Sequence, residues 1–118
     1  MLLLNTYSMS PPDQGAILNV VFNCILYPLL EEFFFRGGVL FYLDQHDVFS
    51  RKIYSNVVVS AFFSICHLWY WDASHAALVF FPSLILGWIF QRSQSWLLCA
   101  VTHMFFNSIY MYFRAIAL

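Results

Sequence analysis

Four long apolar stretches joined by short polar connectors constrain this chain more than any other feature of its sequence. The stretches cover residues 16–43, 53–71, 76–91 and 95–117. A helix that crosses the hydrocarbon core of a bilayer needs about 20 largely apolar residues, and each stretch approaches or exceeds that length. Because unpaired backbone groups are too costly in lipid, we expect every stretch to be helical.

The composition excludes the other classes of protein that a chain of this length can form. Hydrophobic residues make up 62% of the 118 positions and charged residues only 9%, whereas a typical soluble domain is about 25% charged. So few charges cannot cover a soluble globule, and the apolar content excludes intrinsic disorder. A net charge of -1 provides no basic surface for nucleic acid. An integral membrane protein remains.

The connectors predict how the helices are arranged. They are short, so consecutive helices should be antiparallel neighbours. We therefore predict an all-α fold, an integral membrane bundle of four transmembrane helices with short loops. Residues 1–15 are expected to form an N-terminal tail and residues 16–118 one helical core. The predicted location is the cell (plasma or inner) membrane as a multi-pass protein surrounded by lipid, and the sequence does not indicate an oligomeric state.

Prolines and caps give local detail. Pro28 and Pro82 lie inside two of the apolar stretches and predict kinks there. Neighbouring helices or water must satisfy the carbonyl groups that each proline frees. Asp72 or Ser74 is placed to cap the third helix.

Three charged residues lie within an apolar stretch instead of between stretches: Glu31, Glu32 and Arg36. Ionisable groups at bilayer depth are costly and by default indicate function. Glu32 and Arg36 are spaced i,i+4 and can pair. Glu31 points about 100° away from Glu32 and has no obvious partner on its own helix, which suits a general base. The alternative is that the three charges form a buried polar clasp between helices.

Polar residues on other helices supply further candidates. His103 and Asn107 are spaced i,i+4 on the fourth stretch, so both project to one face. Each can donate a hydrogen bond to a developing oxyanion, although a polar contact between helices is the alternative. His67 lies late in the second stretch, where a buried histidine is more often a packing residue. His46 and His75 lie in connectors, and no role is predicted for them.

These residues form three spaced motifs that resemble those of the CAAX protease and bacteriocin-processing family of intramembrane proteases. In sequence order they are Glu31-Glu32-x-x-x-Arg36, Phe63-x-x-x-His67 and His103-x-x-x-Asn107. Each motif is weak alone, but all three occur in order on three predicted membrane helices. The resemblance covers the chain from about residue 16 onward. By similarity, Glu32 and Arg36 would be the supporting pair that orients the site.

The resemblance implies hydrolysis of a peptide bond within the membrane. By similarity, Glu31 would activate the attacking water with help from His67. His103 and Asn107 would stabilise the tetrahedral oxyanion. The implied substrate is a protein or peptide tail with an apolar or lipid-modified segment, and no cofactor or metal is implied for a glutamate-dependent mechanism.

Two alternatives stay open at the level of the sequence. Glu31, His67 and His103 are plausible zinc ligands, and a zinc ion with an open position also activates water. The absence of a His-Glu-x-x-His motif weakens this zinc hypothesis without excluding it. The second alternative is a non-catalytic membrane scaffold or sensor that binds a peptide tail at the same polar site.

Overall fold

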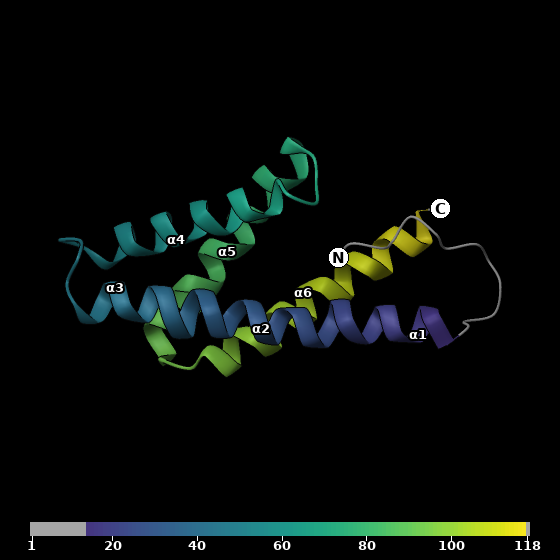
Figure 1. Cartoon of the computed structure of the whole chain (residues 1–118), viewed down its shortest axis with the longest axis horizontal. Helices are drawn as coiled ribbons and strands as arrows, with labels where there is room; N and C mark the ends of the chain where they lie inside the picture. The colour runs from purple at the N-terminus through teal and green to yellow at the C-terminus, as the bar shows by residue number, and fades with distance from the viewer. Residues whose placement is uncertain (1–13, 118) are drawn as a thin grey trace.

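The structure is a computed structural model that describes residues 14–117 and is helical with short connectors (Figure 1). No strand occurs within these residues, so the predicted all-α fold is confirmed. Almost all of the predicted N-terminal tail, residues 1–15, lies outside the described residues.

The first apolar stretch forms one long helical rod that includes two π-helical segments. Along the chain its elements are α1 (Gln14–Val21), η2 (Phe22–Leu26), α2 (Tyr27–Phe34), η3 (Phe35–Leu40) and α3 (Phe41–Gln45). The other three stretches form α4 (Lys52–His67), α5 (Ala73–Ser93) and α6 (Trp96–Ile116). The helices therefore follow the predicted stretches closely. The two main differences are that α4 ends at residue 67 instead of 71 and that α5 begins at residue 73 instead of 76.

The turn between α4 and α5 lies earlier in the chain than the sequence predicts. α4 ends at His67 because the backbone N–H groups of Tyr70 and Trp71 both fold back onto the His67 carbonyl, at 3.2 and 2.9 Å. Asp72 caps α5, as predicted, by accepting a hydrogen bond from the backbone N–H of His75 at 2.8 Å. This cap places His75 inside the first turn of α5, so its assignment to a connector was wrong.

Many large apolar side chains are exposed on the outside of the molecule, and two ionic side chains are buried within it. Ile65, Leu78 and Phe105 are each more than 60% exposed, whereas Glu32 and Arg36 are fully buried. A soluble protein has the opposite distribution, and a surface of this kind fits a lipid environment. Two helices, residues 15–45 and 73–93, are long and apolar enough to span a membrane. The predicted number of four spans stays a prediction.

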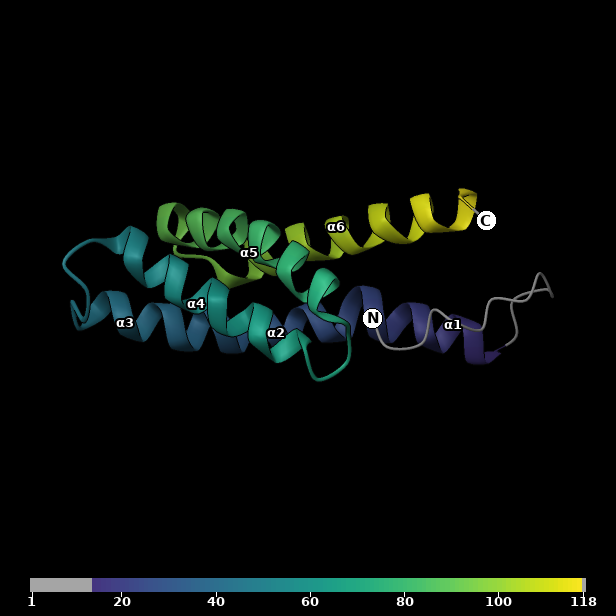
Figure 2. The ribbon, with the colours of Figure 1, turned by 90° about the horizontal axis from the view of Figure 1, so that it is seen from above.

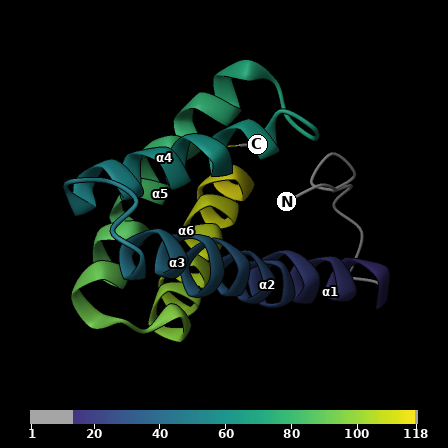
Figure 3. The ribbon, with the colours of Figure 1, turned by 60° about the vertical axis from the view of Figure 1, so that its left-hand side comes forward.

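Packing joins the helices in two pairs. α4 lies along α5, and α6 crosses the long rod near α2 (Figures 2 and 3). Gly87 permits the first contact, because a Cβ atom there would lie 1.8 Å from Oδ1 of Asn56. The buried apolar core between the pairs consists of Phe35, Leu40, Val59, Phe63, Leu86, Phe90 and Cys99. Through these contacts α4, α5 and α6 all pack against the η3 segment of the long rod.

Pro28 leaves a carbonyl of the long rod without its usual partner, and α6 supplies a donor. In η2 the backbone bonds run to the fifth residue ahead, which for the Asn23 carbonyl is Pro28, a residue without an N–H. Nδ2 of Asn107 donates to this carbonyl at 3.1 Å. The prediction that a neighbouring helix would satisfy such a carbonyl is confirmed here. α5 continues through Pro82 as one α-helix.

Candidate active site

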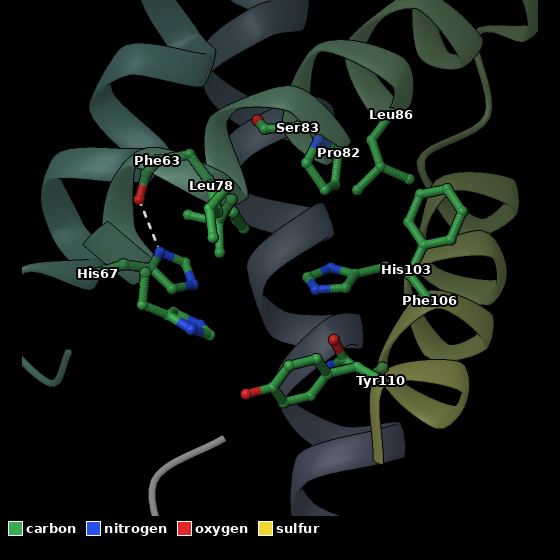
Figure 4. A pocket seen from close by; sticks show the side chains of 12 residues that line it. Phe63, His67, Leu78, Pro82, Ser83, Leu86, His103, Phe106 and Tyr110 are labelled. Atoms are coloured by element: carbon green, nitrogen blue, oxygen red, sulfur yellow. Dashed lines mark hydrogen bonds between the residues drawn. The ribbon is translucent and has the colours of Figure 1, made fainter. Parts of the chain in front are cut away.

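A cavity of about 230 Å³ lies between α4, α5 and α6 (Figure 4). Among its walls are three of the predicted catalytic side chains, His67, His103 and Asn107. The complete lining consists of Phe63, His67, His75, Leu78, Val79, Pro82, Ser83, Leu86, His103, Phe106, Asn107 and Tyr110. The fold therefore brings together polar residues from the second and third motifs.

Glu31, the predicted general base, lies beside this cavity and next to His103. Its Oε2 atom is 3.6 Å from Nε2 of His103, and its side chain is 33% exposed. Glu31 is not among the lining residues, and its contact with the site is this approach to His103, which does line the cavity. The predicted lack of a partner on its own helix fits this geometry, because its neighbour comes from α6.

His103 lies between the two adjacent glutamates of the long rod. Its Nδ1 atom is 2.8 Å from Oε1 of Glu32, while its Nε2 atom faces Glu31. A carboxylate can only accept a hydrogen bond, so Nδ1 carries the proton of this contact. The helical offset between Glu31 and Glu32 thus sends two carboxylates to the two nitrogens of one imidazole.

The Glu32–Arg36 pair that the spacing predicts is present and fully buried. Nη1 of Arg36 lies 3.2 Å from each carboxylate oxygen of Glu32. Nη2 donates to both the hydroxyl and the carbonyl of Ser83 at 2.5 Å, and the guanidinium lies 5.2 Å from the centre of the Phe63 ring. The pair therefore connects the rod to α4 and α5 and holds the carboxylate that orients His103.

His67 is oriented by its own helix. Its Nδ1 atom donates to the Phe63 carbonyl one turn earlier, at 2.8 Å. The Phe63 ring lies 4.5 Å from the His67 ring and 6.0 Å from the His103 ring, measured between centres. Figure 4 shows the two imidazoles approaching the cavity from opposite sides. With Nδ1 engaged, Nε2 is the nitrogen of His67 that can act on a bound molecule.

Asn107 serves the fold as well as the cavity. Its Nδ2 atom carries two hydrogens, and one of them is donated to the Asn23 carbonyl. The contact fixes the amide that lines the cavity. The predicted interhelical role and the predicted oxyanion role of Asn107 are therefore compatible.

Sequence reasoning missed three polar residues of the cavity, Ser83, His75 and Tyr110. The His75 ring stacks on Trp71 at 4.2 Å, and Tyr110 meets it edge-on at 5.9 Å, between ring centres. Two signals were available in the sequence. Tyr110 continues the i, i+4, i+7 spacing of His103 and Asn107, and the Asp72 cap places His75 in a helix.

The predicted zinc alternative requires Glu31, His67 and His103 to meet around one point. Within residues 14–117, no three His, Cys, Asp or Glu side chains gather closely enough to hold a metal ion. These residues therefore do not fit a zinc site in the arrangement that they have here.

Comparison with known proteins gives one match. The family model of the Rce1-like type II CAAX prenyl endopeptidases matches residues 13–109, a range that includes all three motifs. No curated protein and no solved structure matches the chain.

Proposed function

Because this chain belongs to the Rce1-like family of type II CAAX prenyl endopeptidases, we propose that it hydrolyses a peptide bond in the tail of a prenylated protein by means of a water activated by Glu31. Membership supports a membrane-embedded protease that acts on lipid-modified proteins. The choice of Glu31 as the base depends on one observation: its carboxylate lies 3.6 Å from Nε2 of His103, which lines the same cavity as His67.

The first step of the proposed reaction is the removal of a proton from water. Glu31 accepts the proton while the water oxygen attacks the carbonyl carbon of the substrate. His67, whose Nδ1 donates to the Phe63 carbonyl, accepts a hydrogen bond at Nε2 from the second O–H of the same water, and that hydrogen stays on the oxygen. The two contacts would orient a lone pair of the water toward the substrate, which is the positioning that general-base catalysis needs.

The second step is the collapse of the tetrahedral intermediate. The oxyanion accepts hydrogen bonds from the free amide hydrogen of Asn107 and from Nε2 of His103 when that ring carries both protons. Glu31 then returns its proton to the leaving nitrogen, so that the products are a carboxylic acid and an amine. Donors fixed before the reaction act strongly in a cavity of low dielectric constant.

The Glu32–Arg36 pair acts at a distance from the reacting atoms. Glu32 fixes the His103 ring through Nδ1, and Arg36 keeps Glu32 in place through contacts with Ser83. An imidazole held at one nitrogen presents its other nitrogen in a constant direction. Both residues are thus positioning residues in this proposal.

The proposal is tested with the purified protein in lipid nanodiscs and a prenylated peptide that ends in a CAAX sequence. Mass spectrometry identifies the products. We expect the wild type to release the C-terminal fragment and Glu31→Gln to release none above background. Asp47→Asn is the matched control, because it makes the same kind of change at an exposed connector position where φ is 46° and Asn is well tolerated. Equal cleavage by Glu31→Gln and wild type would refute the proposal.

The two alternatives predict different results in the same preparation. A zinc protease would contain zinc in a one-to-one ratio and lose cleavage when treated with a chelator. A scaffold would bind the prenylated peptide without releasing a fragment, and Glu31→Gln would leave that binding unchanged.

A further inference from the structure

The cavity holds polar groups that the proposed chemistry does not use. His75 comes from the first turn of α5, and Tyr110 comes from the same face of α6 as His103 and Asn107. Neither belongs to the three motifs. Ring contacts hold His75 between Trp71 and Tyr110, so its position at the cavity wall is fixed by packing.

One atom of this group lacks a hydrogen-bond partner. Nε2 of His75 is buried and unpaired, and within residues 14–117 it is the only such atom on a residue that lines the cavity. The polar side chains of His67, Ser83, His103 and Asn107 all have protein partners. Buried polar atoms are rarely left unpaired, so this atom is expected to gain a partner when the cavity is occupied.

The proposed function supplies a group of matching chemistry, and this inference rests on it. Cleavage of a CAAX tail releases a short apolar peptide that ends in an α-carboxylate. A carboxylate enters an apolar cavity only if donors replace its water, and imidazole and phenol groups are such donors. We propose that Nε2 of His75, helped by the hydroxyl of Tyr110, whose ring packs edge-on against the His75 ring, binds the terminal carboxylate of the substrate and makes the enzyme specific for free C-termini.

Two prenylated peptides that differ only at the terminus, one a free acid and the other an amide, test this inference in nanodiscs. We expect wild type to prefer the acid by about tenfold in kcat/KM, the effect of one charge-assisted hydrogen bond. His75→Phe keeps a ring to stack on Trp71 and should bring the acid-to-amide ratio close to one. His75→Gln restores a donor and should recover part of the preference, while Tyr110→Phe should reduce it.

His46→Phe is the matched control. His46 also stacks on an aromatic ring at 4.2 Å, that of Tyr42, but it is exposed and is not among the residues that line the cavity. An unchanged ratio in both His75→Phe and Tyr110→Phe would overturn the inference and leave the proposed function intact. If His75→Phe lost cleavage of the acid and of the amide peptide to the same extent, the inference would also be overturned, because His75 would then serve the fold or the chemistry. If wild type cleaves neither peptide, the proposed function fails and the inference fails with it.

Discussion

His103 is the residue through which the two neighbouring glutamates act on one site. Glu32 contacts Nδ1 at 2.8 Å and Glu31 faces Nε2 at 3.6 Å. The sequence predicts that the two carboxylates diverge, because adjacent helical positions differ by about 100°. It cannot predict that one ring from α6 fits between them, since this depends on how α6 crosses the rod.

The buried Glu32–Arg36 pair, which contacts His103, gives the first prediction. Glu32→Gln leaves the buried Arg36 without an anion, so we expect a loss of about 3–5 kcal/mol in the free energy of unfolding and a loss of cleavage. Adding Arg36→Gln removes the unpaired charge and should recover part of the stability. Cleavage should stay low in the double variant, because His103 still lacks its carboxylate. Unfolding in detergent and peptide cleavage measure the two effects.

An equal loss of stability in the single and double variants would contradict this account of the pair. Stability and activity that recover together in the double variant would mean that Glu32 serves the fold alone.

At the scale of the elements, the distortion of the long rod matters for the site. Pro28 leaves the Asn23 carbonyl without a donor from its own helix. Nδ2 of Asn107, on α6, donates to this carbonyl instead. Pro28→Ala returns an N–H to the rod, which can then bond within its own helix. We expect kcat/KM for the prenylated peptide to fall on the order of tenfold, because Asn107 loses the contact that fixes it.

Asn107→Ala removes the same contact from the other side. In that background Pro28→Ala should have little further effect on cleavage, since coupled residues are not additive. Two independent, multiplying effects would show that Pro28 and Asn107 act separately.

The close approach of α4 and α5 gives the third prediction. A Cβ atom at Gly87 would overlap with Asn56, whereas one at Gly38 would have only the Phe33 carbonyl at 3.8 Å as a neighbour. Gly87→Ala should therefore reduce the free energy of unfolding by about 1–3 kcal/mol. Gly38→Ala should leave it unchanged or raise it by up to about 1 kcal/mol, because Ala favours a helix more than Gly does. Similar thermal unfolding of the two variants in detergent would contradict the proposed packing.

For the whole molecule, the inverted distribution of side chains predicts an asymmetric response to surface charge. Ile85, in the middle of α5, and Val48, in the connector after α3, are about equally exposed, at 49% and 50%. Ile85→Lys should cost about 2.5–3.5 kcal/mol in membrane insertion, and Val48→Lys should cost almost nothing. The fraction of protein that resists alkaline extraction from membranes measures this difference. Equal extraction of both variants would contradict a lipid-facing α5.

The sequence was sufficient for the helices and for most of the site because both depend on local spacing. Apolar length predicts the four stretches, and the i,i+4 rule predicts the Glu32–Arg36 pair and the shared face of His103 and Asn107. The sequence was insufficient for η2 and η3, because apolar length and i,i+4 spacing do not distinguish a rare π-helical segment from an α-helix. It also missed the wall formed by His75, whose approach to Tyr110 depends on how α5 packs against α6.

The most direct test of the account is the rate at which metal-free protein cleaves the prenylated peptide, with and without the Glu31 carboxylate. We predict that chelator-treated wild type keeps its kcat and that Glu31→Gln lowers kcat by about 10²–10⁴-fold, the usual contribution of a general base. Chelator-treated wild type that is inactive until zinc is restored, or Glu31→Gln with a kcat close to that of wild type, would contradict the central claim that Glu31 activates the water.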